Sequence, residues 1–397
     1  MPWSETSPMD QKTQFIADVL RGGLPVVELC DDYGISRKTG YKWIDRYLKE
    51  GPEGLRDRSR RPAGCPNGTS PELVQAIIDA RRRHPSWGAK KLLKILHDKH
   101  PRWSWPQRST VCEILKRNGL VTKKRRRRAI GHPGKPTTIV TAPNDLWCAD
   151  YKGQFKTGDG RYCYPLTVTD DFSRYLIGCQ GLLDTSVDGA KPVFTRLFRE
   201  FGLPKRIRTD NGVPFASAHA LFGLSKLAVW WLRLGIQIER IQPGHPQQNG
   251  RHERMHLTLK KEATKPAAQN FLQQQARFDD FTDCYNHERP HQALNMKYPA
   301  ELYEPSSRPY RGLHELSYPF HDRTITVTQC GRLCMSRQKI NLSTVFAGQK
   351  LGVKQISDKI WLVTFMDYDL GFFDDETCRL EPIANPFAAK VLPMSPE

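Results

Sequence analysis

The pattern of apolar and polar positions changes its period several times along the chain. Near the N-terminus, apolar residues recur at helical spacing in QKTQFIADVLRGG, LPVVELCDDYGIS and RKTGYKWIDRYLKEG, with glycine or serine at each junction. Residues 1–55 are therefore predicted to form a helix-turn-helix domain whose third helix is capped by Ser36 and reads DNA. The exposed side of that helix is expected to carry Arg37, Lys38, Tyr41 and Lys42, while Trp43, Ile44 and Tyr47 largely face inward. A three-helix packing module with no DNA role is the alternative.

The next segment, residues 56–70, is rich in glycine, proline and arginine and is predicted to be a linker. The helical period returns over residues 71–120 in PELVQAIIDARRRHP, GAKKLLKILHDKHP and PQRSTVCEILKRNGL, which predicts a second helical DNA-binding domain. Its potential metal ligands, His84, His97, His100 and Cys112, have no spacing typical of a tetrahedral zinc site, so no structural metal is expected.

A basic segment, residues 121–140, follows this second domain. Like charges repel one another, so the segment should be extended until a phosphate backbone neutralises it, and we interpret it as an arm along the minor groove. A nuclear-localisation signal or a merely solvated run are the alternatives. The residues expected to contact DNA are Lys123, Lys124, Arg125, Arg126, Arg127 and Arg128.

Strand-like runs replace the helical period in the second half of the chain. LWCADYKGQF, CYPLTVTDDFS and YLIGCQGLL predict three antiparallel strands, and a helix, a strand, a helix, a strand and further helices follow. This order predicts a ribonuclease-H-like α/β core with a mixed sheet over residues 141–305. Short strands at close spacing predict a small β-barrel over residues 315–385, and residues 386–397 are expected to be a disordered tail. The fold class is thus multidomain, with all-α modules, an α/β core and a small β-barrel.

The amino-acid composition indicates a binding partner and a cellular compartment. The chain of 397 residues has a net charge of +19, and residues 1–140 hold 29 Lys or Arg against 14 Asp or Glu. Such asymmetry favours a polyanion, most simply double-stranded DNA. Ten cysteines without a CxxC pair argue against a disulfide scaffold and favour a reducing compartment. Without an apolar run near eighteen residues or a signal peptide, the chain is expected to be soluble, intracellular and without a membrane partner.

Three acids carry the candidate chemistry of the predicted core. Asp150 lies near the end of the first strand and Asp210 follows the fourth, and these two strands lie side by side in this topology. The helix after the fifth strand would bring Glu253 over them. Three oxygen donors with no histidine or thiolate nearby suit Mg²⁺ or Mn²⁺. Two such ions, roughly 3.5–4 Å apart, can activate an attacking oxygen and stabilise the leaving 3′ oxygen of a phosphodiester.

Each acid also has an ordinary structural interpretation. TDNG, around Asp210, is also a tight turn, and Glu253 is also a first-turn glutamate favoured by the helix dipole. Asp170 and Asp171 are rivals for the catalytic role, but they fall at a hairpin and point to opposite faces, so we interpret them as turn and structural residues.

The helix that carries Glu253 also holds several basic residues. They are His252, Arg251, Arg254, Lys260 and Lys261, and they are expected to hold DNA phosphates around the carboxylate. Lys260, seven residues beyond Glu253, lies within roughly 20° of the same helix face, whereas Lys261 is rotated by about 100° from Lys260. Lys260 is therefore the candidate DNA contact near the acids, and a lysine on a solvated face is the alternative.

An ordered set of motifs resembles the integrase-core transposases of bacterial insertion sequences, relatives of retroviral integrases. The motifs are RKTGYKWIDRY followed by EGLRDRSRRP, then HPSWGAKKL, LWCADYKG, RTDNGVPF, GHPQQNGRHERMHLTLKKE and YNHERPHQAL. The resemblance implies a DDE site at Asp150, Asp210 and Glu253, a divalent metal, nicking at element ends and attack of the freed 3′-OH on another phosphodiester. It also implies that four residues shape active-site loops, namely Asn211, Gly212, Asn249 and Gly250.

Some features depart from that family pattern or leave alternatives open. The zinc-binding His/Cys pattern at the front of retroviral integrases is missing, and 42 residues lie between Asp210 and Glu253, more than in those enzymes. Asn286, Arg289 and His291 are expected to brace the last core helix against the sheet. The expected protein is a homo-oligomer on DNA in the bacterial cytoplasm, associated with the nucleoid. The rival functions are a catalytically inactive helix-turn-helix regulator derived from a transposase and a nuclease that only hydrolyses.

Overall fold

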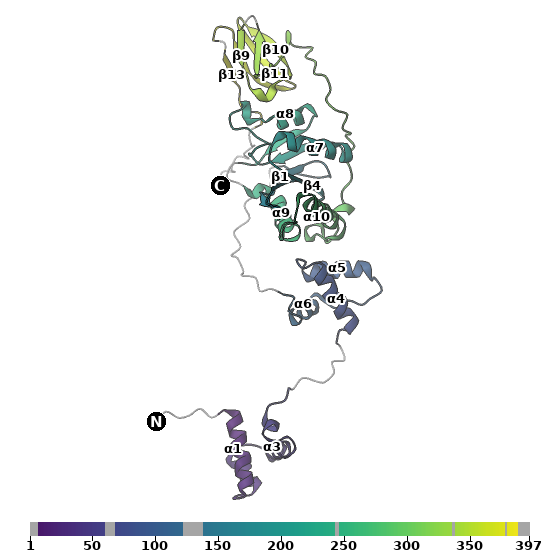
Figure 1. The fold of residues 1–397 in the computed structure, drawn as a ribbon, viewed down its shortest axis with the longest axis vertical. Coiled ribbons are helices and arrows are strands. Elements are labelled where there is room, and N and C mark those ends of the chain that lie inside the picture. The colour runs from purple at the N-terminus through teal and green to yellow at the C-terminus, as the bar shows by residue number, and fades with distance from the viewer. Residues whose placement is uncertain are drawn as a thin grey trace, which may run out of the picture. The chain divides into compact units, whose positions relative to one another are not determined.

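The computed structural model describes residues 7–59, 68–121, 138–242, 246–335, 338–377 and 379–387. The chain divides into two compact units, Met1–Thr69 and Ser70–Glu397 (Figure 1). The basic residues expected to form a DNA-binding arm, 123–128, lie outside the described residues, as do much of the linker and most of the tail. Among the helices of the described ranges, none is both long and apolar enough to cross a membrane.

The first unit consists of three helices around a small apolar core, as the helical period predicted. They are α1 (Pro8–Arg21), α2 (Val26–Asp32) and α3 (Arg37–Glu50), followed by the 3₁₀ turn η1 (Gly51–Leu55). The Ser36 hydroxyl accepts a hydrogen bond from the Thr39 amide at 3.3 Å, which confirms Ser36 as the N-cap of α3. Gly40 lets α3 pack closely on α2, because a Cβ there would collide with the Cys30 sulfur.

The second unit begins with three more helices around their own core. They are α4 (Pro71–Arg83), α5 (Ala89–Lys99) and α6 (Arg108–Arg117). Ile77, Leu92 and Val111 meet in this core with less than 1% of their surface exposed, and Trp87 closes it. These helices match the three that the second helical period predicted.

A six-stranded mixed sheet forms the centre of the second unit. Its strands are β1 (Trp147–Tyr151), β2 (Phe155–Lys156), β3 (Tyr162–Asp170), β4 (Leu176–Leu182), β5 (Arg206–Thr209) and β6 (Gln237–Arg240). Hydrogen bonds follow the order β2-β3-β1-β5-β6, with β4 pairing β3. The β1–β3 and β3–β4 pairs are antiparallel, while β1–β5 and β5–β6 are parallel. This confirms the predicted ribonuclease-H-like order, to which the structure adds the short β2.

Four helices cover the two faces of this sheet. They are α7 (Val187–Phe201), α8 (Lys226–Arg233), α9 (Gly250–Glu262) and α10 (Phe271–Asp283). Phe194 of α7 and Trp231 of α8 pack with Trp147 on one face, whereas Met255 of α9 and Phe278 of α10 pack with Cys179 on the other. Because strand side chains alternate between faces, the even-numbered residues of β1, Asp150 included, point toward α9.

Short helical turns join these elements. They are η2 (Leu221–Gly223), η3 (Pro246–Asn249), the π-helical turn η4 (Cys284–Glu288), η5 (Gln292–Leu294), η6 (Pro299–Glu301) and η7 (Thr344–Phe346). The stretch LFGLSKLAVWWLRLG is not one continuous helix, because η2 ends before Ser225 caps α8.

The C-terminal part of the second unit is all β. Its strands are β7 (Arg323–Thr326), β8 (Arg332–Met335), β9 (Gln338–Asn341), β10 (Lys350–Ser357), β11 (Ile360–Phe365), β12 (Tyr368–Asp374) and β13 (Arg379–Pro382). Five form an antiparallel sheet in the order β13-β12-β11-β10-β7, and β8 pairs β9 separately. In the described ranges the hydrogen-bonded path does not join β13 to β7, so the closed small barrel expected from the sequence is not confirmed.

Helix α8 belongs to two cores at once. Leu227, Trp230 and Trp231 pack into the core of the mixed sheet. Ala228, Val229 and Leu232 pack instead with residues of the C-terminal strands. The residues between Asp210 and Glu253 therefore include a helix that is buried on both sides.

Candidate active site

Asp150 and Asp210 are brought together by the register of two parallel strands. Trp147 of β1 pairs with Ile207 of β5, and Cys148 pairs with Arg208. Two residues further along the same register, Asp150 lies beside Asp210, which follows the last residue of β5. The convergence of these two acids, predicted from the topology, is therefore present in the sheet.

Glu253 completes the acidic group from the first turn of α9, where its side chain is exposed. Burial of the Asp150 carboxyl, followed by the negative charges of Asp210 and Glu253, raises the pKa of Asp150 to about 7. Burial also raises the pKa of Asp210. Asp210 and Glu253 are therefore close enough to Asp150 to affect its ionisation. Without a cation nearby, the charge of one acid makes ionisation of its neighbour less favourable.

The oxygen atoms of the three carboxylates do not all lie within 4.8 Å of one another. In the described ranges, the groups of potential metal ligands whose atoms lie within 4.8 Å of one another are Asp150 with His252 and His256, and His84 with Cys284 and Glu288. The first of these groups includes one of the predicted acids and two residues that sequence reasoning did not assign to the site.

His252 and His256 lie on the inner face of α9, against β3. His252 is 1% exposed and His256 is 7% exposed. The His256 Nδ1 is 3.7 Å from an Asp150 carboxylate oxygen. The expectation that no histidine lies near the acids was therefore wrong. It failed because α9 turns this pair toward the sheet, where the i, i+4 spacing in RHERMH puts both rings on one face.

The two imidazoles are neutral. Burial lowers the pKa of His252 to about 3 and that of His256 to about 2. His252 was expected to be one of the cations that hold DNA phosphates, and this was wrong because the ring is buried and uncharged. Instead, His252 Nδ1 lies 2.7 Å from the Thr169 hydroxyl, and the Nε2 atoms of His252 and His256 lie 2.8 and 2.7 Å from the Thr167 hydroxyl.

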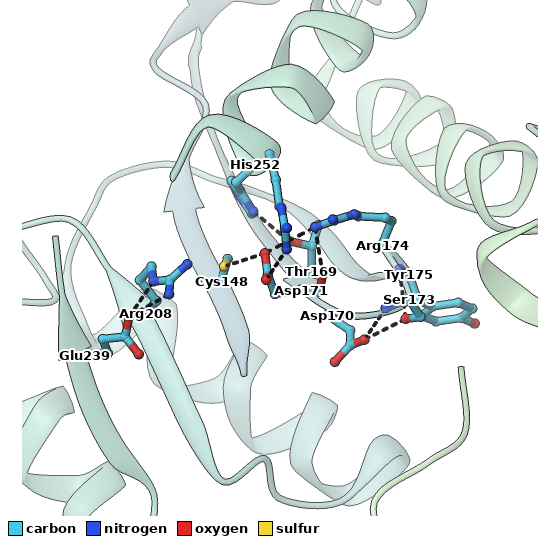
Figure 2. A network of polar contacts seen from close by, with 11 residues as sticks. Cys148, Thr169, Asp170, Asp171, Ser173, Arg174, Tyr175, Arg208, Glu239 and His252 are labelled. Carbon is cyan, nitrogen blue, oxygen red and sulfur yellow. Dashed lines mark hydrogen bonds and ion pairs between the residues drawn. The ribbon is translucent and has the colours of Figure 1, made fainter. Parts of the chain in front are cut away.

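Asp171 ties the start of α9 to the sheet rather than joining the acidic group. The Arg251 guanidinium lies 2.6 Å from one Asp171 oxygen, and the Arg174 guanidinium lies 3.3 Å from the other. Only 3% of the Asp171 side chain is exposed, so its charge is neutralised inside the protein. Figure 2 shows Asp171 and Arg174 in this network, with His252 bonded to Thr169 beside them.

Asp170 is equally well satisfied within its own hairpin. It accepts hydrogen bonds from the Asn144 amide at 2.8 Å, the Ser173 amide at 2.8 Å and the Ser173 hydroxyl at 2.6 Å. This arrangement agrees with the interpretation of Asp170 and Asp171 as turn and structural residues. A further buried pair, Arg208 with Glu239, joins β5 to β6 at 2.6 Å (Figure 2).

The four expected loop residues lie next to the acids. Asn211 donates to the Ile241 carbonyl at 2.9 Å, and the Gly212 amide donates to Asp210 at 3.2 Å. Asn249 is 5% exposed and precedes Gly250, the first residue of α9. The Asn249 Oδ1 atom has no hydrogen-bond partner among the described residues.

Lys260 is exposed on α9 and interacts electrostatically with Lys152, which follows β1. The pKa of Lys152 is lowered by burial and then by Lys260, and it is raised by Asp150. Lys152 therefore lies within electrostatic range of both Lys260 and Asp150, which indicates that Lys260 is on the Asp150 side of α9. The candidate DNA contacts of the first unit, Arg37, Lys38, Tyr41 and Lys42, are exposed on α3 while Trp43 is buried.

The motif after α10 braces the core as expected, and also contacts α9. The Asn286 side chain donates to the Leu176 carbonyl at 2.9 Å and accepts from the Leu176 amide at 2.8 Å, so η4 is fixed to β4. Arg289 binds Glu262 at the end of α9 at 2.7 Å. His291 packs against the Tyr285 ring.

Family models match most of the chain. Two models described as integrase core domain match residues 140–246 and 234–299. A homeodomain-like domain matches residues 39–115, and a helix-turn-helix domain matches residues 11–63. The integrase matches together span the sheet, Asp150, Asp210 and Glu253.

Curated relatives come from insertion elements and retroviruses. The 31.7 kDa protein of insertion element IS407 from Burkholderia multivorans is 25% identical over 60% of this chain and 82% of the relative. The 39.2 kDa protein of insertion element IS476 from Xanthomonas euvesicatoria is 27% identical over 63% of this chain and 69% of the relative. The Gag-Pol polyprotein of baboon endogenous virus is 30% identical over 48% of this chain and 10% of the polyprotein.

Solved structures with similarity to this chain include retroviral integrases. The integrase catalytic core domain of HTLV-2, solved with magnesium, has a TM-score of 0.33 and 16% identity over 41% of this chain and 98% of its own. A chain of the simian T-cell lymphotropic virus intasome, solved in complex with the PP2A regulatory subunit B56 gamma, has a TM-score of 0.37 and 16% identity over 74% of this chain and 97% of its own.

Proposed function

We propose that this chain, which belongs to the integrase-core transposases of bacterial insertion elements in the retroviral-integrase superfamily, binds the terminal inverted repeats of an element and nicks and joins DNA through Asp150, Asp210 and Glu253. The observation that carries this proposal is the electrostatic interaction of the three acids: burial, followed by the negative charges of Asp210 and Glu253, raises the pKa of Asp150 to about 7. Carboxylates so arranged are suited to hold cations.

The donor set of the site fits a divalent metal. Three carboxylates from β1, the end of β5 and α9 offer oxygen ligands of the kind that Mg²⁺ and Mn²⁺ prefer. Two such ions would activate the attacking oxygen and stabilise the leaving 3′ oxygen of the phosphodiester. Asp150 and Asp210 are positioned by hydrogen-bonded strands, and Glu253 is positioned by α9, whose start is fixed through Arg251 and Asp171.

The remaining steps are assigned to residues that face DNA. Lys260 would hold a phosphate of the element's terminal nucleotides near the acids, because it lies on the Asp150 side of α9. Asn211, Gly212, Asn249 and Gly250 would shape the loops that receive the reacting strand. Asp210 keeps its orientation through the Gly212 amide, so the scissile phosphate would approach a pre-set carboxylate.

The helical modules are proposed to supply recognition of double-stranded DNA. Arg37, Lys38, Tyr41 and Lys42 would contact the major groove from α3, and residues 71–120 would form a second DNA-binding domain. Basic residues 123–128 would add salt-dependent affinity along the backbone. Because two element ends must be joined in one reaction, the proposed active form is a homo-oligomer on DNA.

The test is a joining assay with the full-length protein. It should be incubated with duplexes that carry its own element ends, Mg²⁺ or Mn²⁺ and a plasmid target, and the junctions should be sequenced. We expect end-specific nicks and new junctions between end and target. Binding to the ends without any nick would favour the inactive regulator, and nicks without junctions would favour a nuclease that only hydrolyses. The regulator is less well supported, because Asp150, Asp210 and Glu253 are all present and interact.

A further inference from the structure

His256 stands beside the acidic group without a role in the proposed reaction. It is three residues after Glu253 on α9, so the two side chains are neighbours on the helix. Its Nδ1 atom is 3.7 Å from the Asp150 Oδ2 atom. Asp150, Glu253 and His256 therefore border one region, from two elements that are far apart in the sequence.

The hydrogen bonds around Thr167 determine which nitrogen of His256 carries the proton. The Thr167 hydroxyl donates its single hydrogen to the Asp150 carbonyl at 3.0 Å, since a carbonyl can only accept. The same oxygen is 2.7 Å from His256 Nε2 and 2.8 Å from His252 Nε2, and its hydrogen is already used. Both Nε2 atoms must therefore be the donors in these two contacts.

The same reasoning distinguishes the two histidines at their other nitrogen. His252 Nδ1 accepts from the Thr169 hydroxyl at 2.7 Å, so both ring nitrogens of His252 are used. The Nε2 atom of His256 is used by Thr167, so Nδ1 is the His256 nitrogen that faces the Asp150 carboxylate, at 3.7 Å. Potential ligand atoms of Asp150, His252 and His256 lie within 4.8 Å of one another, which is close enough for a shared metal ion.

We propose that His256 is a metal ligand, and that its Nδ1 atom and the Asp150 carboxylate together bind a first-row transition-metal ion such as Mn²⁺. The inference rests on the proposed function, because it concerns the metal held by the same acids. Thr167 is then a positioning residue, since it holds the imidazole in the tautomer that leaves Nδ1 free. His252 is the structural partner of this arrangement and does not bind the metal.

The chemistry of the two donor atoms bears on the choice of ion. Mg²⁺ prefers oxygen ligands, whereas first-row transition metals also accept an imidazole nitrogen. The site should therefore favour Mn²⁺ over Mg²⁺, and a nitrogen ligand should be detectable.

The experiment is pulsed electron paramagnetic resonance on the full-length protein loaded with Mn²⁺ alone. A nitrogen bound to the ion gives a ¹⁴N hyperfine coupling, and growth with ¹⁵N-labelled histidine should convert it to a ¹⁵N coupling. The wild-type measurement needs no variant, so it cannot be lost to misfolding. A bound Mn²⁺ without any histidine nitrogen coupling in the wild type would overturn the proposal.

Matched variants then identify the ring. His256→Phe should abolish the nitrogen coupling and weaken Mn²⁺ binding by about tenfold or more, while Mg²⁺ binding changes by less than about threefold. His252→Phe removes an equally buried imidazole one turn earlier and should keep the coupling. Loss of the coupling in His252→Phe, with retention in His256→Phe, would contradict the assignment.

The outcome separates this inference from the proposed function. Coupling in the wild type together with a failure to join DNA would leave the ligand assignment standing and remove the transposase proposal. Joining of DNA with Mn²⁺ but without a histidine coupling would do the reverse.

Discussion

The two ends of the β1–β3 pair hold aspartates that have different polar partners. At one end, Asp170 accepts three hydrogen bonds and Asp171 binds two arginines. At the other end, Asp150 has a backbone hydrogen bond from Tyr151 but also lies near Asp210, Glu253 and the His256 Nδ1 atom.

This difference distinguishes carboxylates that serve the fold from those available for chemistry. A structural carboxylate is neutralised by the protein itself, and the cost of burying its charge is thereby offset. Asp150 lacks such a partner, and burial with neighbouring negative charge raises its pKa to about 7. The Asp150 end of the strand pair has negative charge without a cation from the protein. A bound metal ion could supply that positive charge.

The strongest test of this comparison removes charge from the Asp150 end. Asp150→Asn, Asp210→Asn and Glu253→Gln should each reduce nicking and joining by about 10³-fold or more, because metal ligation needs the carboxylate charge. Gel-shift binding to element ends should change little, since recognition is proposed to lie in the helical modules. Strand transfer near the wild-type level in one variant would remove that residue from the site.

At the Asp170–Asp171 end, loss of charge is expected to reduce stability rather than catalysis. Asp171→Asn should lower the free energy of unfolding by about 3 kcal/mol, because Arg174 and Arg251 lose their buried counter-charge. Joining measured below the unfolding temperature should stay within about tenfold of the wild type. Denaturant unfolding and the joining assay check the two halves of this prediction. Abolished catalysis in a folded, DNA-binding variant would mean that Asp171 belongs to the catalytic group.

The pH dependence of metal binding sharpens the comparison further. The folded pKa of Asp150 is raised, so this group stabilises the metal-free protein when protonated, and that contribution is lost as pH rises through about 7. Metal binding needs the ionised form, so Mn²⁺ should bind up to about tenfold more tightly at pH 8 than at pH 6. Calorimetric titration at the two pH values measures the ratio. A pH-independent affinity would argue against Asp150 as a ligand.

The smallest effect is expected from Lys260, which is proposed to contact DNA near the acids and is not one of them. Lys260→Ala should reduce joining by about fivefold, corresponding to the loss of one phosphate contact worth ~1 kcal/mol, and Lys260→Glu should reduce it further. Lys261→Ala is the matched control, with an expected change of less than about twofold. Joining rates with pre-cleaved ends report this step. A larger loss in Lys261→Ala than in Lys260→Ala would mean that α9 is rotated relative to the bound DNA.

Much of the fold was predictable because local patterns agreed with the tertiary structure. Apolar spacing predicted the six N-terminal helices, and strand runs separated by turn residues predicted the order of the mixed sheet. The two-residue β2 was too short to give a pattern, and β13 carries no alternation of buried and exposed residues. The break between η2 and α8 also escaped prediction; Phe222 inside η2 has a positive φ of 55°, which sequence spacing does not indicate.

The candidate site was predictable where topology alone decides proximity. Adjacent parallel strands bring Asp150 to Asp210 whatever their side chains do, and the helical phase of Lys260 relative to Glu253 follows from sequence spacing. The role of His256 was not predictable in the same way, since its charge and tautomer depend on burial and on Thr167, 89 residues away. The i, i+4 histidine spacing was the available signal, and it was obscured by the basic residues around it.

Helix α8 packs against both the mixed sheet and the C-terminal strands. Ala228, Val229 and Leu232 are at most 2% exposed, and they are covered by those strands. A fragment that ends after the ribonuclease-H-like sheet would present this apolar side to water and would be prone to aggregate. The sequence predicts the sheet and the C-terminal strands as separate domains, but they share α8 and form one compact unit. Exchanging either part between proteins would therefore require the other to repack around α8.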